Sequence, residues 1–178
     1  MPGPSRMPSS LSRLLAPAGI GLAYAIVQLT MEAFGGGVQS HHLLNRADLP
    51  AISNWFGLLT LPAVGLALGW RARRIGGYTR PLWAGLILSF LYGTALATGF
   101  ELGAQAVMQT LFLGLFVVAI LAPVYRAECI AGFVAGMAFT FGGVLPLMVA
   151  IVFATISAVV RFGAGAVWRR VRPAAGAH

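Results

Sequence analysis

The sequence predicts an all-α fold: a polytopic helical membrane protein with about six membrane segments and a Gly-Gly/Pro break in the last apolar region. Of its 178 residues, 58% are hydrophobic and only 9% are charged, whereas soluble chains are about a quarter charged. The mean hydropathy is +0.85, and a chain of this length cannot hide so much apolar surface inside a water-soluble fold. The apolar stretches are continuous, without the alternation of a barrel strand, so they predict helices.

The first membrane segment is expected over residues 14 to about 38. Residues 1–13, which are rich in proline and serine, predict a disordered cytoplasmic tail before it. The arginines of this tail and the small residues Ala23 and Ala25 also resemble a signal peptide with its cleavage site. Because the apolar character continues well beyond Ala25, we favour an uncleaved first helix.

Proline positions mark the next three segments. The second is expected over residues 50–70. About forty residues, with Glu101 as their single charge, lie between Pro81 and Pro123. Since a membrane helix needs about twenty residues, this stretch predicts two spans joined by a tight turn near residues 99–103. Proline suits both the start of the third segment and the end of the fourth.

The last apolar region, residues 129–160, is too long for one straight span and short for two. Gly142 and Gly143 can end a helix and Pro146 can start the next one, whereas the alternative is a single bent helix. Arginine positions discriminate between the two. With a cytoplasmic N-terminus, a fold-back at Gly142 and Gly143 places 11 arginines inside and 1 outside, and a single crossing places 7 inside and 5 outside. Positively charged loops stay in the cytoplasm, so we expect the hairpin.

This topology gives a helical transmembrane domain over residues 14–165 and a basic cytoplasmic tail over residues 166–178. All 12 basic residues are arginine, and alanine and glycine are abundant, as is typical of proteins from GC-rich bacterial genomes. We therefore expect a multi-pass protein of the bacterial inner membrane with both termini in the cytoplasm.

The composition excludes several chemistries. The chain has no lysine for a Schiff base, and with Cys129 as its single cysteine it has no internal disulfide or multi-thiolate metal site. No histidine lies inside an apolar run, which excludes a haem held within the membrane by two helix histidines. No cofactor or metal is expected. Arginines that flank membrane segments and contact anionic lipids explain the formal charge of +8, so no nucleic-acid binding is expected.

A polar stripe on the first segment is the main candidate for a ligand site. Tyr24, Gln28 and Glu32 are spaced by four residues and share one helix face. On the predicted topology, the outer side also holds most of the carboxylate and histidine side chains, which suggests an outward-facing polar pocket. The predicted ligand-binding residues are Tyr24, Gln28, Glu32, His41, His42, Glu101 and Gln105.

These residues also have simpler interpretations. Glu32 and Glu101 can be solvated carboxylates at the outer surface. The adjacent His41 and His42 would point about 100° apart on a helix and to opposite faces of a strand. They therefore make a poor metal chelate by themselves.

Two further patterns have structural interpretations. Gly65 with Gly69, and Gly132 with Gly136, favour close packing of helices within the chain. The mixed-charge segment 126–128 is expected to be a short loop whose role is to fix the topology.

Three classes of function fit these observations. The first is a small integral membrane protein acting as a solute carrier or solute-binding membrane subunit, which would need partners as an energy source because no Walker motif is present. The alternative is a non-catalytic accessory or assembly subunit of a larger membrane complex. The third is a membrane enzyme that uses the outward Glu and His residues, although no catalytic motif connects them. The expected partners are membrane lipids, an unidentified small-molecule ligand and other membrane proteins.

Overall fold

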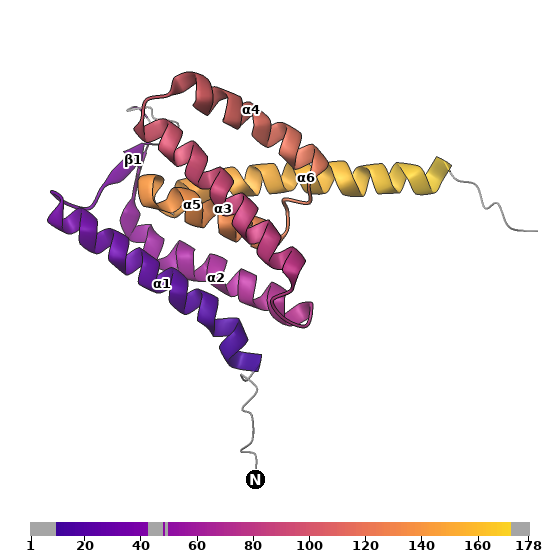
Figure 1. Cartoon of the computed structure of the whole chain (residues 1–178), viewed down its shortest axis with the longest axis horizontal. Helices are drawn as coiled ribbons and strands as arrows, with labels where there is room; N and C mark the ends of the chain where they lie inside the picture. The colour runs from indigo at the N-terminus through magenta and orange to yellow at the C-terminus, as the bar shows by residue number, and fades with distance from the viewer. Residues whose placement is uncertain (1–9, 43–47, 49, 172–178) are drawn as a thin grey trace, which may run out of the picture.

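The computed structural model describes residues 10–42, 48 and 50–171, and most of this range is helical. The elements in chain order are α1 (Ser10–Phe34), β1 (Ser40–His42), β2 (Ala51–Ser53), the 3-10 helix η2 (Asn54–Phe56), α2 (Gly57–Arg74), α3 (Arg80–Glu101), α4 (Gln105–Leu121), α5 (Ala127–Phe141) and α6 (Val144–Val171). Figure 1 shows these helices side by side, with the C-terminal part of α6 projecting beyond the others. The predicted all-helical class is confirmed.

Helices α1 and α2 form one closely packed pair. Gly65 and Gly69 on α2 face the backbone of Pro17 and Leu14 on α1, and a methyl group at either glycine would clash with those carbonyl groups. Gly21 on α1 faces the backbone of α2 in the same way. Small residues allow two helix backbones to approach closely in a membrane, where apolar side chains gain little by leaving lipid. The packing predicted for Gly65 and Gly69 is confirmed.

Helices α3 and α5 form the second close pair, with extensive contacts along their length. Gly132 and Gly136 on α5 face the backbone carbonyls of Leu86 and Phe90 on α3. Gly93 on α3 faces α5 in return. This second predicted glycine pair is therefore also a contact within the chain.

The last apolar region folds back on itself. Helix α5 ends at Phe141, Gly142 adopts a φ of +70° that favours glycine, and α6 begins at Val144. The hydroxyl of Ser157 on α6 donates a 2.8 Å hydrogen bond to the carbonyl of Ala122, which lies shortly before α5 in the chain. Helix α6 has thus returned along α5 to its starting end, so the helices fold back at Gly142 and Gly143 as predicted, whereas two membrane crossings by this region stay a prediction.

The number of membrane crossings stays a prediction. Within the described residues, four helical stretches are long and apolar enough to cross a membrane: Leu11–Phe34, Asn54–Arg74, Arg80–Glu101 and Val144–Ala166. Helices α4 and α5 have 17 and 15 residues. At about 1.5 Å per residue, these two are about 25 and 22 Å long, shorter than the roughly 30 Å hydrocarbon core of a bilayer.

The boundaries differ from the predicted ones at several places. Helix α1 begins at Ser10 and ends at Phe34, one turn earlier than expected at both ends. Residues 51–56 precede α2 instead of belonging to it, because β2 pairs antiparallel with β1 and η2 follows directly. Helix α6 continues to Val171, into the segment expected to be a tail. Of the two predicted tails, residues 1–9 and 172–178 lie outside the described range.

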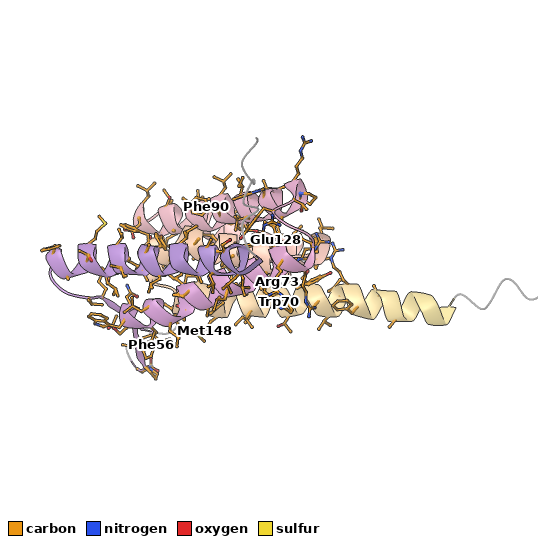
Figure 2. All side chains as sticks on the ribbon, turned by 90° about the horizontal axis from the view of Figure 1, so that it is seen from below. Phe56, Trp70, Arg73, Phe90, Glu128 and Met148 are labelled. Atoms are coloured by element: carbon orange, nitrogen blue, oxygen red, sulfur yellow. The ribbon has the colours of Figure 1, made fainter. Side chains whose placement is uncertain are left out.

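The basic residues gather at one end of the bundle, which we call the arginine end. It contains Arg13, Arg71, Arg73, Arg74, Arg80, Arg126 and Arg161. The Tyr78 hydroxyl donates to the Arg13 carbonyl at 3.0 Å, which joins the α2–α3 connection to α1. Arg161 donates to the Leu121 carbonyl, which joins α6 to the end of α4. Burial raises the pKa of Tyr78 above its ordinary value. Figure 2 shows Trp70, Arg73 and Glu128 at this end and Phe56 at the opposite one.

Candidate functional site

The predicted polar stripe on α1 is part of a hydrogen-bonded cluster at the end opposite the arginines. The Glu32 carboxylate accepts a 2.6 Å hydrogen bond from Asn54 Nδ2 and a 3.1 Å bond from Gln28 Nε2, both on Oε1. Its other oxygen accepts the backbone N–H of Gln39 at 3.0 Å. We call Tyr24, Gln28, Glu32, Gln39 and Asn54 the Glu32 network.

The Glu32 network ties α1 to three other parts of the fold. Gln28 Nε2 also donates to the Ala138 carbonyl on α5 at 2.8 Å, and the Tyr24 hydroxyl donates to the Ala135 carbonyl at 3.3 Å. Gln28 is 3% exposed and Asn54 is 5% exposed. In the described part of the chain, the only buried side-chain polar atom without a partner is Thr94 Oγ1, outside this network. The buried polar atoms of the network are therefore satisfied internally, as a structural clamp requires.

The other predicted site residues lie apart from this network. His41 and His42 belong to β1, where His41 pairs with Ile52, and their side chains fall outside what the structure describes. Glu101 and Gln105 are exposed on either side of the α3–α4 turn. Among the described residues, no hydrogen bond joins these two side chains to Glu32, and no three His, Cys, Asp or Glu residues could hold a metal ion together.

A cavity of about 380 Å³ lies elsewhere, between α3, α4, α5 and α6. Helices α3 and α4 meet at their turn and diverge away from it (Figure 1), and α4 contacts α3 much less extensively than α5 does. Tyr92 on α3 bridges to α4 through a 2.6 Å hydrogen bond from its hydroxyl to the Leu111 carbonyl. The walls are mostly apolar and include Leu115, Phe133 and Phe153. We call this space the α3–α6 cavity.

The α3–α6 cavity reaches the arginine end, where its lining becomes polar. Arg126, Glu128, Cys129 and Ser89 line this part. Glu128 is 2% exposed, and its Oε2 lies 3.3 Å from Nε of Arg71, whose side chain is about one-third exposed. A buried carboxylate needs such a partner because its desolvation is costly.

Arg126 differs from Arg71 in having no such partner. It precedes the first turn of α5 and is half-buried in the cavity lining. Across the residues that the structure describes, its guanidinium makes no hydrogen bond and no ion pair. The polar part of the cavity therefore holds an ion pair and one further positive charge.

Glu128 and the cavity are the features that sequence reasoning missed. The segment 126–128 was expected to be a loop, but Ala127 and Glu128 form the first turn of α5, and the Glu128 side chain is buried. An available signal was a glutamate directly before the apolar run from Cys129, since acidic residues favour the first turn of a helix. No local pattern in the sequence indicates the cavity, because its lining residues come from four separate helices.

No family model, curated protein or solved structure matches this chain.

Proposed function

We propose that this protein is an integral membrane protein that binds an apolar or amphipathic small molecule in the α3–α6 cavity, as a carrier or a solute-binding membrane subunit. The observation that carries the proposal is the cavity itself. Its volume of about 380 Å³ lies within the roughly 300–1,000 Å³ range of small-molecule sites, which are mostly apolar with a few polar groups. The α3–α6 cavity has this same combination.

Entry from the lipid phase fits the position of the cavity. Two of its lining residues, Pro81 and Leu88, are exposed on the outer face of α3. In a bilayer this face would contact acyl chains, because the surrounding α3 surface exposes further large apolar side chains such as Ile87 and Leu91. An apolar ligand would reach the cavity without passing through water.

The proposal includes an orientation in the bacterial inner membrane. The arginine end faces the cytoplasm, since basic residues near membrane segments are retained there, and the Glu32 network and Glu101 face outward. Six segments cross or enter the bilayer, with α4 and α5 as the short ones. The α3–α6 cavity then has its polar part at the cytoplasmic side.

The Glu32 network is assigned a structural role in this proposal. Its carboxylate already accepts three hydrogen bonds from the protein. A carboxylate has about four acceptor positions, so at most one is left for an outward solute. The α3–α6 cavity, in contrast, is open space.

The first test is thermal unfolding of the purified protein in a neutral detergent against a panel of solutes. The panel contains long-chain alcohols and fatty acids, quinones, vitamins, amino acids and divalent metals. A ligand that binds only the native state stabilises it, by about 2.7 kcal/mol at a hundredfold excess over its dissociation constant. We expect saturable stabilisation by amphipathic members of the panel and none by amino acids or metals.

A matched pair of variants tests whether the ligand binds in the α3–α6 cavity. Val118 lines the cavity, whereas its neighbour Val117 is 56% exposed on the outer face of α4. Val118→Phe should remove the stabilisation and Val117→Phe should keep it. Stabilisation that survives Val118→Phe but is lost in Glu32→Gln would contradict the proposal and favour the outward polar site. No stabilisation by any solute, from monodisperse protein, would favour an accessory subunit.

A further inference from the structure

We infer that the α3–α6 cavity binds a single-chain amphiphile with an anionic head group, and that Arg126 binds this head group. The inference rests on the proposed function and specifies the class of ligand. Ligands of this class have one alkyl chain that ends in a carboxylate or a phosphate. Size, polarity and charge of the cavity support it independently.

The size of the cavity favours one alkyl chain. A diacyl phospholipid is much larger than a space of about 380 Å³. The apolar part lies between Leu115, Phe133 and Phe153, all of which are buried. A chain placed there packs against these side chains and gains dispersion contacts along its length.

The polarity of the cavity gives the ligand a direction. Apolar walls occupy the part between the four helices, and the polar residues Ser89, Arg126 and Glu128 line the part at the arginine end. An amphiphile with its chain among the phenylalanine rings would place its head group beside Arg126. This is also the end where head groups of surrounding lipids would lie.

Charge selects an anionic head group over a neutral or cationic one. The Glu128 carboxylate is paired with Arg71 at 3.3 Å, so these two charges offset each other. Arg126 adds a positive charge with no hydrogen-bonded or ionic partner in the described part of the chain. Arg161 lies near the same edge, bound to the carbonyl of Leu121. A guanidinium group binds carboxylate or phosphate through two parallel hydrogen bonds.

The test is a binding titration by native mass spectrometry of the full chain released from a neutral detergent. The probes are dodecanoate, dodecyl phosphate, 1-dodecanol and dodecylammonium, which share one chain length and differ in the head group. We expect at least one of the two anions to bind about tenfold or more tightly than the alcohol, as a charge-assisted hydrogen bond predicts. The cation should bind more weakly than the alcohol. Whichever of the two anions binds more tightly identifies the preferred head group.

Arg126→Gln should reduce the preference for the anion over the alcohol to within about twofold. The matched control is Arg73→Gln, because Arg73 is exposed at the same end and does not line the cavity. It should keep the full preference. If Arg126→Gln does not yield monodisperse protein, Arg126→Lys replaces it. Lysine cannot form the bidentate hydrogen bonds of a guanidinium group, so this variant should lower the preference for the anion over the alcohol several-fold.

Four results would overturn the inference in different ways. Equal binding of alcohol and anions to the unmodified protein would refute the anionic head group and leave the proposed function standing. An equal loss in Arg126→Gln and Arg73→Gln would show a general surface charge effect, and an unchanged preference in Arg126→Lys would exclude guanidinium binding. Failure of all four probes to bind, while another amphipathic solute of the thermal panel stabilises the protein, would refute the single-chain ligand and leave the proposed function standing.

Discussion

The Glu32 carboxylate joins three successive segments of the chain, through partners 4, 7 and 22 residues away. Gln28 lies on α1, the same helix as Glu32. Gln39 lies just before β1, and Asn54 is the first residue of η2, which precedes α2. All three groups donate hydrogen bonds, and the two carboxylate oxygens accept them. The same residue therefore fixes both the end of α1 and the entry into α2.

A substitution of Glu32 tests this role. Glu32→Gln replaces one acceptor oxygen by an amide NH2, which would face one of the present donors. We expect the free energy of unfolding to fall by about 1–3 kcal/mol, the usual cost of a lost partner for a buried polar group. Glu101→Gln, an exposed carboxylate at the same end, should stay within about 0.5 kcal/mol of the unmodified protein. Equal effects of the two variants in thermal unfolding would rule out the clamp.

Spacing along the chain predicted part of the site and could not predict the rest. The row of Tyr24, Gln28 and Glu32 follows from helical periodicity, and all three side chains point toward one set of neighbours. Their partners are remote: Asn54 lies 22 residues from Glu32, and Ala138 lies 110 residues from Gln28. No periodicity relates residues at such separations. Only the tertiary structure shows that the polar groups of the stripe already form hydrogen bonds within the protein.

At the scale of the elements, glycine determines which helices pair. Along α1–α2 and α3–α5, the backbone of one helix lies directly against glycines of the other. Helix α4 has no comparable contact with α3, and the only close approach to Gly114 is by the Tyr92 hydroxyl. The looser packing of α4 leaves room for the α3–α6 cavity.

Two alanine substitutions separate packing from helix propensity. Gly65→Ala places a methyl group against the Pro17 carbonyl, whereas Gly19 on α1 has nothing within 4 Å of the added carbon. Helix propensity alone favours alanine over glycine by about 0.5–1 kcal/mol at both positions. We therefore expect Gly19→Ala to be neutral or stabilising and Gly65→Ala to be destabilising by about 1–3 kcal/mol. Stabilisation by both variants in thermal unfolding would contradict the close α1–α2 contact.

Strong local signals predicted the elements, and weak ones did not. Pro81 at the start of α3, the turn before Gln105 and the break at Gly142 were all recognisable, because proline and glycine restrict or free the backbone directly. The strands β1 and β2 have three residues each, too few to establish an alternating pattern. Their pairing delays the start of α2, which explains the early start predicted for that segment.

For the whole molecule, the fold concentrates charge of one sign at one end. Arginines that are far apart in the chain, such as Arg13, Arg80 and Arg161, meet at the arginine end because consecutive helices alternate in direction. The α5–α6 hairpin is essential to this asymmetry, since a continuous helix would carry Arg161 to the other end. The three-dimensional arrangement thus agrees with the arginine count that favoured the hairpin.

Cysteine labelling can test the orientation directly, because Cys129 is the only natural cysteine. In a Cys129→Ser background, single cysteines replace the exposed residues Leu102 in the α3–α4 turn, Thr79 between α2 and α3, and Ala166 on α6. A membrane-impermeant maleimide should label Leu102→Cys in intact bacterial spheroplasts, and should label Thr79→Cys and Ala166→Cys only after permeabilisation. This result follows if the arginine end is cytoplasmic and α5 and α6 fold back within the membrane. Labelling of Ala166→Cys in intact spheroplasts together with Leu102→Cys would instead show that residues 129–160 cross once, and would contradict both the hairpin topology and the cytoplasmic C-terminus.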